Sequence, residues 1–304
     1  PDILANVEVK EGRVFTLRLR KGHRWSDGTP FTTEDFRYWW DDVANHKKLS
    51  PLGPPKQMVV AGEPANFKVI DTHTIQFSWS TPNPHFLPAL AASTPLYIYR
   101  PAHYMKKFHA DYAAAVKLNA MVKKSGRQNW AALHNKLDNQ YKNDNPDLPT
   151  LQPWVLRTKP PSQRFIFERN PYFHRVDQNG RQLPYIDEIA MSVAAGGVIP
   201  LKTGAGESDL QARGIAFSNY TFLKEAEKRE NFRVKLWQTA KGAHLALFPN
   251  MNAKDEIWRT LMRNVQFRRA LSLAINRREI NQVIYYGLAI EGQNTVLPES
   301  PLHK

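Results

Sequence analysis

The stretch VFTLRLRKGHRWSDGTPFTTEDFRYWWDDV, residues 14–43, carries the clearest structural pattern in the sequence. In its first part Phe15, Leu17 and Leu19 alternate with polar residues, which is the period of a half-buried β-strand. A polar turn, Ser-Asp-Gly-Thr-Pro at residues 26–30, follows the strand, because glycine permits a positive φ there and proline fixes the exit. This part of the stretch therefore predicts a strand that ends in a tight turn.

A helix is predicted directly after that turn. Thr32 and Asp35 have the spacing of a capping box, with Asp in place of the usual Glu. The residues that follow form one apolar helical face with spacings of three and four: Phe36, Trp39, Trp40 and Val43. The order of strand, W-S-D-G-T-P turn and capped helix is distinctive as a whole.

Composition narrows the class of protein. The 304 residues are enough for two domains, and the absence of cysteine excludes disulfides, cysteine–zinc sites and thiol catalysis. The net charge of +14 could reflect a nucleic-acid or anionic-membrane partner, or else a basic surface that is simply solvated. Because the Lys and Arg residues are scattered along the chain, the second interpretation is favoured. No apolar run is long enough for a membrane span, and the first residues do not form a signal peptide. Because residue 1 is Pro, we expect a processed or trimmed piece.

The rest of the chain alternates between strand and helix patterns. We expect hairpins over residues 5–20 and 67–79, helices over 104–143, and strands at 154–156, 164–169 and 183–189. A charged helix at 222–229, an alternating strand at 232–237 and another strand at 244–248 follow. The last third predicts a helix pair capped by Asn264 and Asn276 and stopped by Gly287. This alternation predicts an α/β fold.

The search for catalytic patterns favours binding over catalysis. The sequence has no G-x-S-x-G elbow and no H-E-x-x-H motif. Asp41 and Asp42 are adjacent, so their carboxylates diverge on a helix, and the ten His are dispersed without a metal-ligand spacing. We therefore predict no enzyme, no cofactor and no metal site. A hydrolase with an unrecognised site stays open as an alternative.

Four stretches, in this order, resemble the bacterial extracellular solute-binding proteins of the peptide/nickel type, family 5, which deliver ligands to ABC importers. Residues 14–43 match the family's strand–turn–helix signature, and FIFERNPYF at 165–173 is similar to its E-R-N-P strand end. YIDEI at 185–189 with GAGESDLQ at 204–211 resembles two further segments. NVQFRRALSLAINRREINQV at 264–283, with PESP at 298–301, resembles the family's helix pair and the loop after it.

The resemblance implies a two-lobed α/β fold of the periplasmic-binding-protein type (type II), incomplete in this chain, that closes over its ligand by hinge motion. It suggests four parts: an accessory domain at 1–103, a helical insertion at 104–147, a core-lobe portion at 148–243, and a hinge strand with the start of the second lobe at 244–304.

The resemblance also nominates ligand-binding residues in two groups: Gln211, Ala212 and Arg213 after the G-E-S-D segment, and His244, Phe248 and Asn250 near the hinge. Arg213 could pair with a carboxylate or phosphate, and a surface Arg at a helix end is the equal alternative. The implied function is capture of a peptide or peptide-like solute for an ABC importer permease, in the periplasm or on a lipid anchor. The alternatives are a basic nucleic-acid-binding protein and a fragment that binds no ligand alone.

Overall fold

The computed structural model describes residues 2–92, 94–142, 144–237, 243–292, 296–297 and 300–302. Its contacts divide the chain into two compact units, Pro1–Val193 and Ala194–Lys304. This two-way division does not test the four parts expected from the sequence, which remain a prediction.

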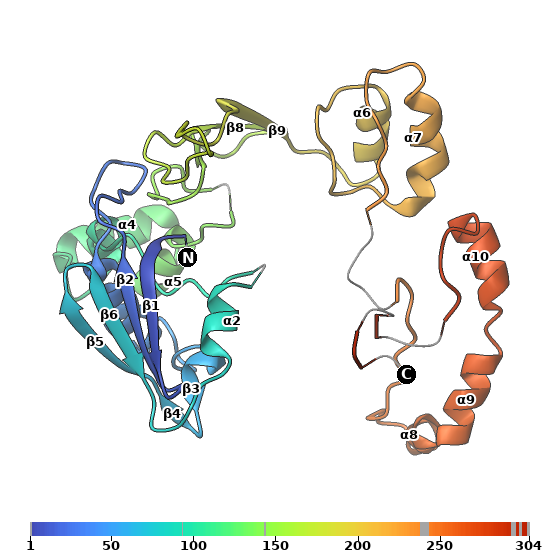
Figure 1. Ribbon diagram of the computed structural model, residues 1–304, viewed down its shortest axis with the longest axis horizontal. Coiled ribbons are helices and arrows are strands. Elements are labelled where there is room, and N and C mark those ends of the chain that lie inside the picture. The colour runs from blue at the N-terminus through green and yellow to red at the C-terminus, as the bar shows by residue number, and fades with distance from the viewer. Residues whose placement is uncertain are drawn as a thin grey trace. The chain divides into compact units, whose positions relative to one another are not determined.

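Unit 1 contains a four-stranded antiparallel sheet in the order β1-β2-β6-β5 (Figure 1). The strands are β1 (Leu4–Lys10), β2 (Val14–Leu19), β5 (Asn66–Asp71) and β6 (Thr74–Ser78). Phe15 lies opposite Phe77, and Leu17 opposite Ile75, so the apolar residues of β2 and β6 share one face. Both hairpins predicted from the sequence are confirmed.

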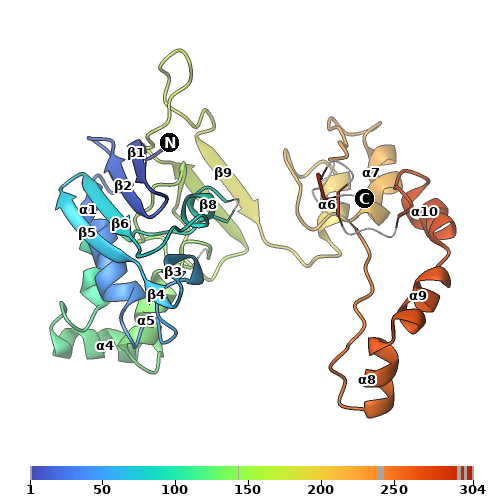
Figure 2. The same cartoon turned by 60° about the horizontal axis from the view of Figure 1, so that its bottom comes forward.

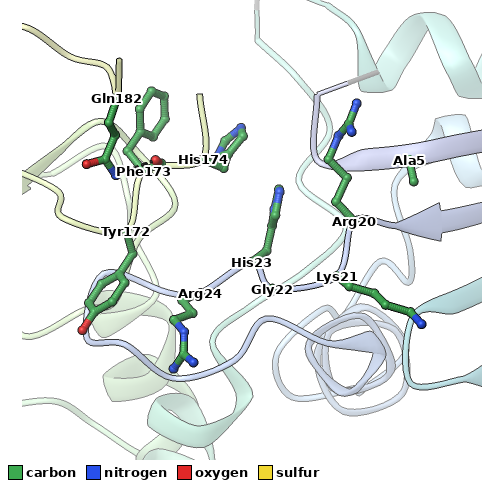
Figure 3. Close-up of a pocket in the computed structure, with 10 residues that line it drawn as sticks. All are labelled: Ala5, Arg20, Lys21, Gly22, His23, Arg24, Tyr172, Phe173, His174 and Gln182. Carbon is green, nitrogen blue, oxygen red and sulfur yellow. Dashed lines mark hydrogen bonds between the residues drawn. The ribbon is translucent and has the colours of Figure 1, made fainter. Parts of the chain in front are cut away.

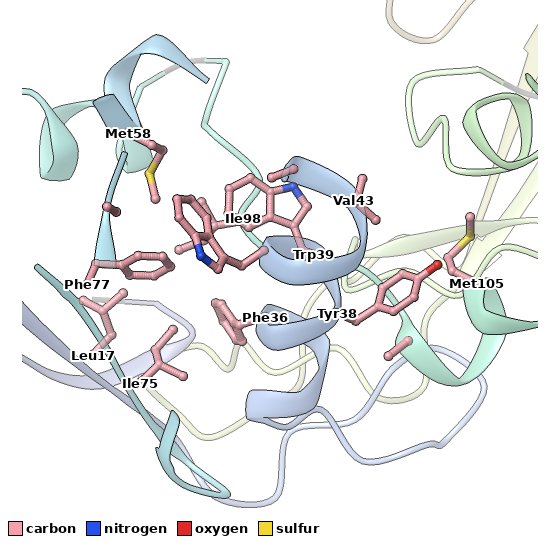
Figure 4. Packing of buried hydrophobic residues seen from close by; sticks show 14 of the residues in the cluster. Leu17, Phe36, Tyr38, Trp39, Val43, Met58, Ile75, Phe77, Ile98 and Met105 are labelled. Carbon is pink, nitrogen blue, oxygen red and sulfur yellow. The ribbon is translucent and has the colours of Figure 1, made fainter. Parts of the chain in front are cut away.

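The predicted helix covers that apolar face. It starts as α1 (Thr33–Arg37) at a complete capping box of Thr32 and Asp35, and continues as a π-helix, η1 (Tyr38–Ala44). The four residues of the predicted apolar face are all buried, together with Tyr38. Figure 4 shows this helix packed on side chains of the sheet, including Leu17, Ile75 and Phe77.

Short elements complete this part of unit 1: η2 (Lys56–Met58), β3 (Val59–Val60), β4 (Glu63–Pro64), α2 (Phe86–Leu90), α3 (Ala102–Met105), η3 (Lys106–Phe108), α4 (Ala115–Ser125) and α5 (Trp130–Leu137). The helical character predicted for 104–143 is confirmed. The Asn129 side chain accepts a hydrogen bond from the Ala132 backbone N–H at 2.9 Å, which caps α5.

A second antiparallel sheet, in the order β7-β8-β9, also lies in unit 1. Its strands are β7 (Trp154–Leu156), β8 (Arg164–Arg169) and β9 (Glu188–Ser192). The first two lie where the sequence predicted them, whereas the strand expected over 183–189 starts only at Glu188. After β8, the fully buried Asn170 donates to the Gln152 carbonyl and accepts from the Tyr172 N–H, both at 2.9 Å. This side chain therefore fixes the turn that positions Tyr172.

The regular elements described in unit 2 are helices: α6 (Ile199–Gly204), η4 (Phe217–Asn219), α7 (Tyr220–Ala226), α8 (Glu256–Arg263), α9 (Val265–Leu273) and α10 (Arg277–Tyr285) (Figure 2). Asn264 caps α9 and Asn276 caps α10, as predicted. Gly287, at φ 76°, ends the pair. Helix α8, capped by Asp255, was not predicted.

Two predicted strands are wrong. Residues 232–237 and 244–248 are irregular, although their alternation fits a strand. A strand needs a neighbour for its backbone N–H and C=O groups, and neither segment pairs with any other described segment. The apolar side chains of Trp237 and Phe248 accordingly stay exposed, at 75% and 87%.

Among the described residues, the longest apolar helices fall short of the length and hydrophobicity needed to cross a membrane.

Candidate functional site

The first predicted ligand group lies in the loop between α6 and η4. Gln211 donates a side-chain hydrogen bond to the Arg213 carbonyl, and Ala212 and Arg213 are exposed. Gly214 has a φ of +72°, which favours glycine, and a Cβ there would lie 2.6 Å from the end of the Ile199 side chain at the start of α6. Among the described residues the Arg213 guanidinium has no acidic partner, which leaves it available to an anionic group.

The second predicted group lies after the undescribed residues 238–242. His244 and Phe248 are exposed, and Asn250 accepts a hydrogen bond from the Asn252 N–H at 3.0 Å within a turn. The His244 ring lies 5.8 Å from that of Tyr285, centroid to centroid. In the described part of the chain, no hydrogen bond or ring contact joins this group to the first.

The His244 contact belongs to an aromatic cluster, which we define as Phe217, Tyr220, His244, Tyr285 and Tyr286. The Phe217 ring is stacked on Tyr220 at 5.6 Å and 7°, and lies 5.6 Å from Tyr285 and 5.9 Å from Tyr286. The cluster joins η4, α7 and the end of α10. None of its rings is fully buried, so their faces can stack on a ligand.

Of this cluster, only His244 was predicted from the sequence to bind ligand. The available signal was the adjacent pair Tyr285-Tyr286 at a helix end, where aromatic side chains are left partly exposed.

A cavity of about 660 Å³ lies in unit 1 (Figure 3). Its lining comprises Ala5, Arg20, Lys21, Gly22, His23, Arg24, Tyr172, Phe173, His174 and Gln182. His23 and His174 face each other with ring centroids 4.8 Å apart. In Figure 3, Lys21 and Arg24 point away from this pair of rings.

Two of the arginine side chains around the cavity already donate hydrogen bonds to backbone carbonyls. The Arg20 Nε–H donates to the Asp2 carbonyl at 3.2 Å, and an Arg24 N–H donates to the Gly28 carbonyl at 2.8 Å. Burial, with help from the charges of His174 and Arg20, lowers the pKa of His23 to about 4, so its ring is neutral at pH 7. Its Nδ1 is buried and has no hydrogen-bond partner among the residues that the structure describes. The cations around the cavity do not converge on one point, because Arg20 and Arg24 donate to backbone carbonyls.

Asp2 does not line the cavity, but its carboxylate accepts a hydrogen bond from His174, which does. Burial alone would raise the pKa of its carboxyl, but hydrogen bonds from Arg175 and His174 outweigh that effect and lower it to about 2. Asp2 is therefore ionised at neutral pH and balances the cations around it. None of the six residues predicted to bind ligand lines this cavity.

One group in unit 1 has the residue types of a metal site. Ligand atoms of His46, His109 and Asp111 all lie within 4.8 Å of one another. This group could not be predicted from the sequence, because His46 and His109 are far apart in the chain and spacing rules detect only neighbouring ligands.

Comparison with known proteins now identifies the family. Residues 1–304 match the model of the bacterial extracellular solute-binding proteins, family 5, middle region. The chain belongs to this family. This match confirms the resemblance inferred from the four sequence stretches. The family consists of binding proteins rather than enzymes.

Individual relatives agree with this assignment. The family 5 chain is 27% identical to a periplasmic alpha-galactoside-binding protein of Rhizobium meliloti, over 91% of its own length and 38% of the relative. It is 28% identical to the periplasmic oligopeptide-binding protein OppA of Salmonella typhimurium, over 57% of its own length and 28% of the relative. The chain thus spans well under half the length of these curated relatives.

Solved structures show the fold. A structure of an oligopeptide-binding protein OppA matches 95% of the chain and 46% of its own length, with 35% identity and a TM-score of 0.75. The periplasmic binding protein MelB of Agrobacterium fabrum, in complex with stachyose, matches 96% of the chain at 22% identity and a TM-score of 0.62. The predicted α/β fold of periplasmic binding proteins is therefore confirmed, and the chain covers about half of it.

Proposed function

We propose that the protein is the solute-binding component of an ABC importer and that it captures a peptide or peptide-like solute in the periplasm. The observation that carries this proposal is the likeness to the solved OppA structure, at 35% identity over 95% of the chain. An ABC importer permease would be its membrane partner.

We place the solute at the two residue groups nominated from the sequence. The exposed Arg213 guanidinium suits a peptide carboxylate, because its planar fork donates two parallel hydrogen bonds. Gln211 and Ala212 flank it, and Phe248 and Asn250 would add apolar and amide contacts with His244. The aromatic cluster would supply ring faces for peptide side chains. In this scheme the first group belongs to a core-lobe portion at 148–243, and the second to a hinge segment at 244–304.

An alpha-galactoside is the second candidate solute. The Rhizobium relative is named for such a ligand and matches 91% of the chain. Partly exposed aromatic rings such as those of the cluster also suit the apolar faces of sugars. The two candidates differ in how they would depend on Arg213, because a peptide offers this side chain a carboxylate and a neutral oligosaccharide does not. The effect of removing Arg213 on affinity therefore distinguishes them.

Native mass spectrometry of the full-length protein purified from its own host tests both candidates. A retained peptide mass that is lost on denaturation is the expected result, and a retained oligosaccharide would select the second candidate. Isothermal titration with tri-, tetra- and pentapeptides and with raffinose then measures affinity. Failure to bind any of these, or co-purification with nucleic acid alone, would overturn the proposal.

A further inference from the structure

A mixed nitrogen and oxygen group lies where η1 meets the segment after η3. His46 follows the end of η1, and His109 directly follows η3, with Asp111 two positions later. His109 Nδ1 lies 3.8 Å from a carboxylate oxygen of Asp111, and the rings of His46 and His109 are 5.2 Å apart and nearly perpendicular. The candidate ligand atoms of the three residues lie within 4.8 Å of one another.

The His109 ring is already oriented as a metal-binding histidine would be. Its side chain is fully buried, and its Nε2–H donates to the Asp42 carbonyl at 3.0 Å. A carbonyl can only accept, so Nε2 carries the proton, and Nδ1, on the side of Asp111, is the ring nitrogen with the lone pair. Metal-binding histidines are commonly held by such a bond from the second ring nitrogen. Nδ1 now accepts the Asp111 backbone N–H at 3.2 Å, a bond that a metal would replace.

The charge of the group also suits a cation. The Asp111 carboxylate supplies negative charge to the group, and its side chain is 65% exposed, so it can turn toward an ion. His46 accepts only a long bond, 3.3 Å, from the Lys48 N–H, which it can give up. Lys47 and Lys48 follow His46, but both are exposed and can turn toward solvent.

We propose that His46, His109 and Asp111 bind a late first-row divalent cation, with zinc as its representative, and leave a fourth position for water. Two imidazoles and one carboxylate suit zinc, nickel or copper, whereas calcium and magnesium prefer all-oxygen sites. Zinc–nitrogen bonds of about 2.0–2.1 Å require the ligand atoms to move closer together. Asp111 is 65% exposed and His46 half-buried, so these two side chains can close on the fixed His109.

A bound ion would tie the end of η1 to the chain that follows η3. The Trp130 indole lies next to the site, with its ring centroid 5.3 Å from that of His46 and 4.7 Å from that of His109. Occupancy should therefore change the environment of this indole as well as the thermal stability of unit 1.

Zinc titration of the full chain, with any affinity tag removed and metal stripped by EDTA, tests the site. We expect one zinc per chain in competition with a chromophoric chelator, and a rise in unfolding temperature on binding. Loss of a residue that only hydrogen-bonds to a metal ligand already weakens metal affinity by about 10- to 100-fold. Removing a ligand itself, in Asp111→Asn or His46→Gln, should therefore weaken zinc affinity by at least about tenfold.

His85→Gln is the matched control, because His85 is an exposed histidine outside the group. It should bind zinc as the wild type does. His109 is left intact in these variants because its burial makes misfolding a separate cause of lost binding. No saturable zinc binding, or equal affinity in wild type, Asp111→Asn and His46→Gln, would overturn the proposal.

Discussion

The Tyr172 hydroxyl lies 3.1 Å from the point that a Cβ atom would occupy at Gly28. Gly28, at φ +88°, is the glycine of the W-S-D-G-T-P turn, and Tyr172 is the tyrosine of the E-R-N-P-Y-F stretch. Two motifs that identify the family in the sequence therefore touch within unit 1. This contact shows that they share an architectural role, since Asn170 fixes the turn that presents Tyr172 to Gly28.

Replacing Gly28 by alanine should destabilise the protein. Both the positive φ and the contact with Tyr172 oppose a Cβ, so we expect the free energy of unfolding to fall by about 1–2 kcal/mol in urea denaturation. Gly53→Ala is the control, because Gly53 also has a positive φ but has no atom near its would-be Cβ. Equal losses in the two variants would show that the Tyr172 contact carries no cost.

Trp25 holds the same turn to the helix. Its indole N–H donates to the Asp35 carboxylate at 3.1 Å, and both residues are buried. Trp25→Phe removes this donor to a carboxylate and should lower the free energy of unfolding by about 2–4 kcal/mol, including the lost packing. Trp79→Phe removes a buried indole donor to the neutral Met58 carbonyl and should cost less. A larger loss for Trp79→Phe would contradict this ranking.

Asp35 should make stability depend on pH in an unusual direction. Burial raises its pKa from 3.8 to about 6 even though Thr32, Ala102 and Trp25 donate hydrogen bonds to it. Because the folded-state pKa is the higher one, its stabilising contribution is complete below about pH 4 and is lost as pH rises through 6. The shift corresponds to about 3 kcal/mol.

The comparison that isolates this effect uses Asp35→Asn, which does not titrate. Urea unfolding at pH 4, 5, 6 and 7 should show the wild type losing stability relative to the variant as pH rises. Other titrating groups are common to both proteins and cancel in the difference. A difference that stays constant, or grows in the opposite direction, would refute the assignment of the shift to Asp35.

Arg213→Ala separates the two proposed solutes. If Arg213 binds a peptide carboxylate, the loss of a charge-assisted pair should weaken peptide binding by the full-length protein about 10- to 100-fold in isothermal titration. Binding of raffinose should be unaffected. Arg229→Ala, at another exposed arginine of unit 2, serves as the control. Unchanged peptide affinity in Arg213→Ala would remove Arg213 from the proposed site.

Local sequence signals predicted local structure well. The capping box of Thr32 and Asp35 and the caps at Asn264 and Asn276 depend on residues two or three positions away, and all are confirmed. The bond from the Ala102 N–H to Asp35 joins residues far apart in the chain, so no spacing rule could find it. The same holds for the contact between Gly28 and Tyr172.

The errors have equally physical causes. Alternation at residues 232–237 supplied the pattern of a strand but could not show whether a partner strand exists. The π-helical turns from Tyr38 to Ala44 went unrecognised, since a 3.6-residue period already explained the buried aromatic face. For the candidate site, the six nominated residues came from family resemblance, whereas the ring contacts of Phe217 with Tyr285 needed coordinates.

The three hydrogen bonds to Asp35 also have a consequence for the order of folding. The bond from Thr32 closes a loop of a few residues and costs little chain entropy, whereas the bond from Ala102 must close a loop across much of unit 1. We therefore expect the helix start to form before the transition state and the Ala102 contact after it. One buried carboxylate thus links an early local event to a late long-range one.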